Sequence, residues 1–147
     1  MTSKDSLYAN LHALRVPQDA IDYLIALWDV IQFFDDVADN PADVQRKDTD
    51  IALWNVLVGM QMNTFYARHQ AHLLPMIGNA ILKWQGSDKA ERNGDVGAKT
   101  FVWRASFYDI VLTVVQLCNG PQFAMDNADI VMNLYGEDFE EYLKEFA

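Results

Sequence analysis

Apolar residues recur at spacings of three and four along almost the whole chain, and no segment keeps an alternating pattern for long. Spacings of three and four place side chains on one face of an α-helix, whereas a half-buried strand requires a period of two. The pattern therefore predicts an all-α fold, and specifically a compact single-domain bundle of about six to eight helices over residues 1–147.

Prolines and polar runs mark where the expected helices begin and end. Proline disfavours helical geometry at the preceding residue and suits the first position of a helix, so Pro17 and Pro41 are expected to bound the second helix. Asp48 or Thr49 is expected to cap the third. The expected elements are a helix over 4–15, one from Pro17 to Asp39 or Asn40, one through 51–62, a kink or restart at 63–64, a helix opened by Pro75, a loop centred on 93–97, a long helix over 99–118, one from 121 to near Gly136, and an acidic tail.

Two features predict the core. The run over 99–118 is apolar nearly all round, which is typical of a helix at the centre of a bundle. The tryptophans recur at helical spacing and are expected in the core, although a partly exposed pair would mark a surface for a partner. They are Trp28, Trp54, Trp84 and Trp103.

Composition limits the class of protein. A chain of 147 residues with 51% hydrophobic residues is long enough and apolar enough to bury a core. The single cysteine, Cys118, lies in an apolar run and fits a reducing compartment. The sequence shows neither a signal peptide nor the roughly 18 consecutive apolar residues of a membrane span. We therefore expect a soluble, cytoplasmic protein that does not insert into a membrane.

The formal net charge of −10 narrows the choice of partners. Nucleic acids are held chiefly by clustered lysine and arginine, and the basic residues of this chain are scattered, so nucleic acid binding is not expected. An acidic protein can attract cations or the basic surface of another protein.

The stretch "IQFFDDVADNP" places Asp35, Asp36 and Asp39 in the last turns of the expected second helix. On a helical wheel Asp35 falls inside the apolar sector, Asp39 lies on its flank one turn later, and Asp36 lies farther round. Carboxylates at a helix C-terminus oppose the helix dipole, and partial burial of a carboxylate costs free energy unless a positive group compensates it. The apolar sector comprises Ile21, Leu24, Leu27, Trp28, Ile31, Phe34 and Ala38.

Three arrangements would satisfy the aspartates. Arg104 is the one basic residue inside the apolar part of the expected central helix, and a buried arginine is usually paired with a carboxylate, so it can meet Asp35 or Asp39. Alternatively, Mg²⁺ binds hard oxygen ligands and keeps waters that phosphate oxygens can replace. The third arrangement is a solvated acidic corner, screened by Arg46 and its neighbour Lys47.

The motif "FFDDVAD" resembles the Asp-Asp-x-x-Asp motif of class I terpenoid and prenyl diphosphate synthases, including the aromatic pair that precedes it in many terpene cyclases. The resemblance covers seven residues. It implies that Asp35 and Asp39 bind Mg²⁺ ions that hold a substrate diphosphate, with Asp36 secondary. If the protein acts on a diphosphate in this way, we expect Arg104 or Arg46 to clamp phosphate. The nearest match to the second metal motif of the cyclases has asparagine where that motif has serine or threonine, and consists of Asp129, Asn133 and Glu137.

The chain, from "FFDDVAD" through "NTFYARHQAHLLPMIGNAILKWQ", also looks somewhat like small helical proteins of unknown role carried by tailed bacteriophages. This resemblance favours an accessory role. We therefore expect a small acidic helical protein without catalytic activity that binds a protein partner or self-associates, with Asp35, Asp39 and Arg104 as a structural polar cluster. The alternative is a Mg²⁺-dependent enzyme or binder of a diphosphate-containing small molecule, with Asp35 and Asp39 as metal ligands.

Overall fold

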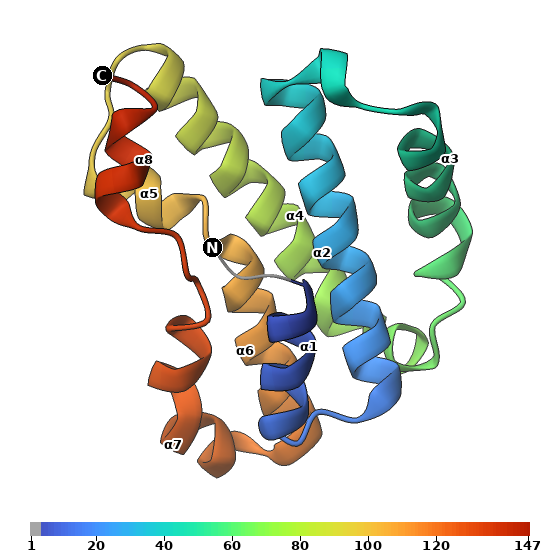
Figure 1. Ribbon diagram of the computed structural model, residues 1–147. Coiled ribbons are helices and arrows are strands. Elements are labelled where there is room, and N and C mark those ends of the chain that lie inside the picture. The colour runs from blue at the N-terminus through green and yellow to red at the C-terminus, as the bar shows by residue number, and fades with distance from the viewer. Residues whose placement is uncertain (1–3) are drawn as a thin grey trace. The chain divides into compact units, whose positions relative to one another are not determined.

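The computed structural model describes residues 4–147, and this part of the chain is all-α, as the hydrophobic period predicts (Figure 1). It contains eight α-helices, a short 3-10 helix and a short π-helix. No helix within residues 4–147 combines the length and the apolarity that crossing a membrane requires. The elements are α1 (Lys4–Ala13), α2 (Gln18–Asp39), the 3-10 helix η1 (Pro41–Asp43), α3 (Arg46–Trp54), the π-helix η2 (Asn55–Gly59), α4 (Thr64–Arg92), α5 (Ala98–Trp103), α6 (Ser106–Asn119), α7 (Pro121–Met132) and α8 (Phe139–Lys144).

The internal contacts of the chain divide it into two units. Unit 1 comprises residues 1–16 and 71–147, and unit 2 comprises residues 17–70. The chain passes from unit 2 to unit 1 within α4, next to His69, whose φ of −117° and ψ of 16° interrupt the helical backbone. That the two units form one domain, as the length of the chain suggests, stays a prediction.

Several expected boundaries are confirmed. Helix α2 ends at Asp39, directly before the Asn40–Pro41 pair, where the backbone N–H of Asn40 donates to the carbonyl of Asp36. A new helix begins at Thr64, and the chain between α4 and α5 is the expected loop over 93–97. These boundaries coincide with proline, glycine and asparagine, the residues whose backbone preferences are strongest.

Other expected boundaries are wrong. Neither Asp48 nor Thr49 caps α3: the cap is Gln45, whose backbone N–H donates to the Asp48 carboxylate at 3.4 Å. Pro75 does not open a helix but lies inside α4 at an exposed position, where water can reach the carbonyl that a proline leaves without a donor. Helix α7 ends at Met132 rather than near Gly136.

The long helix expected over 99–118 is two helices, α5 and α6. They are separated at Arg104 and Ala105, where the Ser106 hydroxyl donates to the carbonyl of Trp103 at 3.0 Å. A serine side chain that bonds to nearby backbone in this way competes with the helical hydrogen bonds. The central position is confirmed for α6, whose buried residues are Ser106, Phe107, Tyr108, Ile110, Val111, Val114 and Val115.

Within unit 1, α6 packs mainly on α7, and α5 packs on α8. The Asn119 side chain at the end of α6 donates to the carbonyl of Leu14 at 3.2 Å, which joins the segment after α1 to this group. Leu7 and Leu11 of α1 and Tyr142 of α8 are fully buried.

Within unit 2, α3 runs back alongside α2 in the opposite direction (Figure 1). The first turn of α2 is tied to the start of α4 through Asp19, whose carboxylate accepts hydrogen bonds from Thr64 at 2.9 Å and from Arg68 at 3.1 Å. The wheel of α2 is correct for Ile21, Leu24 and Leu27, which are buried. It is wrong for its last members, because Phe34 is 51% exposed and Ala38 is exposed as well.

Replacing Tyr23 with phenylalanine should raise the free energy of unfolding by about 1 kcal/mol, because a buried hydroxyl without a partner keeps its desolvation cost. Tyr23 is fully buried, stacks on Tyr66 at 5.3 Å, and its hydroxyl has no hydrogen-bond partner among residues 4–147. Burial raises the pKa of the Tyr23 hydroxyl, which therefore stays protonated in the core. Urea denaturation of the variant measures the change. A loss of stability in Tyr23→Phe would contradict this account, because it would mean that the hydroxyl has a partner in the folded protein.

Candidate functional site

The segment between α2 and α4 is held at both ends within unit 2. It leaves α2 through η1, and it ends at Asn63, whose side-chain amide donates to the carbonyl of Asp19 at 2.9 Å. The Asn63 side-chain oxygen accepts from the backbone N–H of Tyr66 at 2.9 Å and so caps α4. These contacts anchor the segment that contains α3 and the π-helix η2 to α2 and α4.

The π-helix η2 directly follows α3. The backbone N–H of Met60 donates to the carbonyl of Asn55 at 2.9 Å, a bond across five residues that defines a π turn. Such turns are rare and are frequently found at functional sites. Here the turn carries Leu57 to the surface, where its side chain is 64% exposed.

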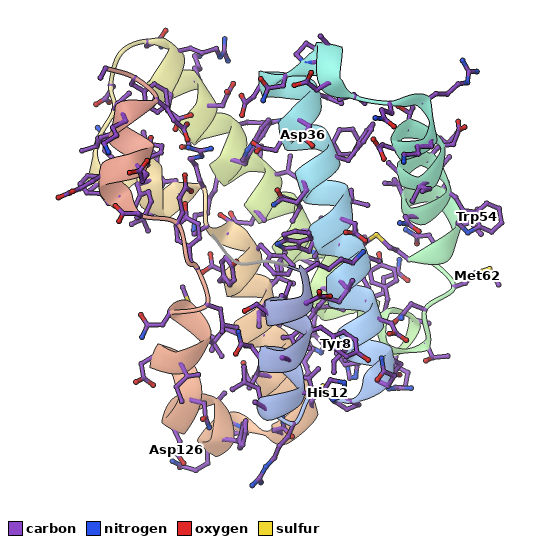
Figure 2. All side chains as sticks on the ribbon, in the orientation of Figure 1. Tyr8, His12, Asp36, Trp54, Met62 and Asp126 are labelled. Carbon is purple, nitrogen blue, oxygen red and sulfur yellow. The ribbon has the colours of Figure 1, made fainter. Side chains whose placement is uncertain are left out.

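Helix α3 and the turns after it bury Ala52 and Met60 but expose most of their other large apolar side chains. Ala52 is 5% exposed, so this side of α3 faces the interior. Five large apolar side chains point the other way or to the flanks, and we call them the α3 surface: Ile51 (57% exposed), Leu53 (58%), Trp54 (62%), Leu57 (64%) and Met62 (76%). Figure 2 shows Trp54 and Met62 projecting away from the ribbon on the same side of unit 2.

Gly59 lies beside the Trp54 ring. A Cβ atom at Gly59 would lie 3.6 Å from Cδ1 of Trp54 and 3.3 Å from the side-chain oxygen of Asn55. The indole therefore lies along the bare backbone of the π-helix while most of its surface stays in water. An aromatic ring that is supported on one side and exposed on the other is suited to anchor a partner.

Acidic residues border the α3 surface. Unit 2 carries nine aspartates and no glutamate, against three basic residues, Arg46, Lys47 and Arg68. Asp43 in η1 and Asp48 and Asp50 in α3 are all exposed. The α3 surface is thus an apolar area on a unit with a net negative charge.

The aspartates of the "DDVAD" motif occupy the last turns of α2. Asp35 is half-buried, whereas Asp36 and Asp39 are exposed, which is the order that the wheel predicts (Figure 2 labels Asp36). Helix α2 has no basic residue in its last turn. The last turn of α2 itself therefore supplies no positive side chain to offset the unfavourable helix dipole at these carboxylates.

Metal binding by these aspartates stays a prediction. Among residues 4–147, no group of three or more histidine, cysteine, aspartate or glutamate side chains is arranged to hold a metal ion. Asp35, Asp36 and Asp39 are close in sequence at the end of α2, and they do not form such a group. A Mg²⁺ ion would have to be held there with water or ligand oxygens in addition.

The second candidate metal set does not share a helix. Asp129 is exposed on α7, Asn133 follows the last residue of that helix, and Glu137 lies in the segment before α8. The Glu137 carboxylate accepts a hydrogen bond from the hydroxyl of Tyr135. A metal role for these residues likewise stays a prediction.

Arg104 lies in unit 1, in the turn between α5 and α6, with its side chain 16% exposed. Its guanidinium is 3.5 Å from the carboxylate of Glu91 and 3.8 Å from that of Glu145, and it lies over the ring of Tyr142 at 5.0 Å. Both of these glutamates belong to unit 1, as Arg104 does. Its pairing with Asp35 or Asp39, which belong to unit 2, stays a prediction, as does the phosphate role of the exposed Arg46.

Tyr142 completes a polar cluster with Glu91, Thr100 and Arg104. Its hydroxyl is 2.6 Å from the carboxylate of Glu91 and 2.6 Å from the hydroxyl of Thr100. Burial, and then the hydrogen bond to Glu91, raise the pKa of Tyr142 and keep the hydroxyl protonated. The cluster joins α8 to α4 and α5 and is a structural feature of unit 1.

Comparison with known proteins adds no relative. Neither the family models, nor the curated proteins, nor the solved structures contain a match to this chain. The resemblances to terpenoid synthases and to phage proteins therefore depend on the residues quoted for them.

The sequence pattern did not identify the α3 surface. Trp54 was expected in the core with the other tryptophans, and this is wrong: Trp54 is 62% exposed, Trp103 is 37% exposed, and Trp28 and Trp84 are intermediate. The exposed surface could have been suspected from the stretch "IALWNVLVGM", because as a helix it would have no polar face to turn toward water. A short helix that is apolar all round has either two buried faces or one exposed apolar face.

Proposed function

We propose that this protein is a non-catalytic interaction module and that it binds a partner protein through the α3 surface. The observation that carries the proposal is the exposure of Ile51, Leu53, Trp54, Leu57 and Met62 within twelve consecutive residues. Single exposed apolar residues are ordinary, whereas a contiguous group of them around a tryptophan is typical of binding sites.

The charge of unit 2 favours a partner with a basic rim around an apolar anchor. Asp48 and Asp50 directly precede the apolar residues in α3, and the unit as a whole is acidic. Opposite charges around an apolar contact accelerate association and exclude partners of like charge. A basic amphipathic helix combines both properties and can lay its apolar face on α3 and η2. An accessory role of this kind agrees with the resemblance to small phage proteins.

A pair of synthetic peptides tests the proposal. The first is an amphipathic helical peptide of leucine and lysine, and the second has the same lysines with each leucine replaced by glutamine. Isothermal titration calorimetry should give the first peptide a Kd on the order of 10 μM and the second a far weaker one. Equal binding of both peptides would mean that charge alone attracts them, and absence of binding by the first would contradict the proposal.

The alternative function is Mg²⁺-dependent binding or turnover of a diphosphate compound at the end of α2. It is supported by the half-buried Asp35 with Asp39 one turn later, and by the match of this turn to the Asp-Asp-x-x-Asp motif. Mg²⁺ held there would neutralise the carboxylates and offer exchangeable positions to phosphate oxygens.

If the protein is an interaction module, millimolar Mg²⁺ should shift the melting temperatures of the wild-type protein and of Asp35→Asn by the same amount. A specific site stabilises the folded state by mass action, so the alternative predicts a rise in melting temperature that Asp35→Asn abolishes. Differential scanning fluorimetry with Mg²⁺, and with Mg²⁺ plus inorganic diphosphate, distinguishes the two. Asp48→Asn, an exposed aspartate of the same unit, is the matched control.

A further inference from the structure

The part of α4 that belongs to unit 1 has one exposed face that is apolar. Its residues recur at spacings of three and four, so they form a single stripe along the helix. We call this stripe the α4 face, and it consists of Ala71, Leu74, Pro75, Gly78, Ile81 and Leu82, all of them exposed. The opposite side of the helix is buried, with Leu73 and Ser87 fully inaccessible to water. Leu74 is 51% exposed, Ile81 49% and Leu82 68%.

The α4 face carries no charge. Residues 70–82 contain no aspartate, glutamate, lysine or arginine, in a chain whose formal net charge is −10. Charges resume at Lys83, which is paired with Asp109 at 2.9 Å. Two copies of an acidic protein repel each other over most of their surface, and a neutral apolar stripe is where they can approach without that cost. A basic partner would gain no electrostatic attraction here.

The order of residues in the stripe is self-complementary. In an antiparallel pair of α4 helices related by a two-fold axis at Gly78, Leu74 of one copy faces Leu82 of the other, and Pro75 faces Ile81. This is the reciprocal pattern that a two-fold interface requires, in which one patch contacts itself. Gly78 has no atom within 4 Å of where its Cβ would be, so this position leaves space for the helix of a second copy to approach closely.

We propose that the protein forms a homodimer through the α4 face, with a second copy of this chain as the occupant. The two stripes together would remove about 1,000 Å² from water, which is near the lower limit for a specific interface and corresponds to a weak, reversible dimer. This inference is independent of the proposed function, since the α3 surface lies in unit 2 and takes no part in it.

Sedimentation equilibrium of the full chain at protein concentrations up to about 0.5 mM tests the proposal, because a dimer of this size should dissociate in the micromolar range. Leu82→Lys places a charge on each side of the two-fold axis and should weaken the dimer about a hundredfold. Leu57→Lys is the matched control, since Leu57 is 64% exposed and lies on the α3 surface. It should leave the dimer unchanged while weakening peptide binding.

A second variant guards against loss of the fold. Gly78→Lys inserts a good helix former into open space, so the monomer should keep its circular dichroism spectrum and melting temperature. The same substitution should abolish the dimer. A wild-type protein that stays monomeric throughout the concentration range would overturn the proposal. So would a dimer that both α4 variants leave intact.

Discussion

Replacing Tyr142 with alanine should lower the free energy of unfolding by about 4 kcal/mol, the largest effect that we expect from a single substitution. Tyr142 is fully buried, and its ring contacts those of Phe101 at 5.3 Å and Phe146 at 5.2 Å. Its hydroxyl reaches both Glu91 and Thr100. The alanine variant therefore leaves a cavity and also removes the hydrogen bond that the Tyr142 hydroxyl donates to the Glu91 carboxylate.

Two further variants separate these contributions in urea denaturation. Tyr142→Phe keeps the ring and removes the hydroxyl, so it should cost about 1–3 kcal/mol. Phe146→Ala removes a ring that is 42% exposed and should cost less than Tyr142→Ala. If Tyr142→Phe were as stable as the wild type, the cluster around Glu91 would not hold α8 in the way the structure indicates.

Replacing Trp54 with alanine should weaken binding of the leucine and lysine peptide about thirtyfold, the effect expected for an aromatic residue at the centre of an interface. Trp54 is the largest side chain of the α3 surface, and its ring lies beside Gly59 of the π-helix. Since the ring is 62% exposed, its removal takes little from the stability of the fold.

Trp103→Ala is the control for this substitution. Trp103 is 37% exposed and belongs to unit 1, whereas the α3 surface belongs to unit 2. Calorimetric titration should give this variant the same Kd as the wild type. If the two tryptophan variants bind the peptide equally well, Trp54 is not the anchor.

The sequence allowed the fold class and several helix ends to be predicted. A helical period that persists through the chain leaves no room for strands, and Pro41, Asn63 and the loop over 93–97 mark boundaries through strong backbone preferences, although Pro75 shows that a proline can also lie inside a helix. Boundaries that depend on side-chain competition were missed. The break at Arg104 and Ala105 depends on the Ser106 hydroxyl, and such a bond can form only after the neighbouring turn has its final geometry.

The candidate site could not be predicted for a related reason. The sequence does not show whether an apolar residue such as Trp54 or Leu57 is buried in a core or exposed to water. The exposure of these residues follows from two structural features. Ala52 is the residue of α3 that faces the interior, and the π turn at Asn55–Gly59 brings Leu57 to the surface. The acidic turn shows the opposite case. Its half-buried Asp35 follows from the wheel, while its chemistry depends on partners that the order of residues does not specify.

The proposal that the α3 surface binds a partner can be tested most directly by heteronuclear NMR of the labelled protein during titration with the leucine and lysine peptide. The account predicts that the perturbed backbone amides fall within residues 46–63 and that the largest changes surround Trp54 and Leu57. Perturbations centred on α4 or α8, or spread evenly over the acidic residues of both units, would contradict it.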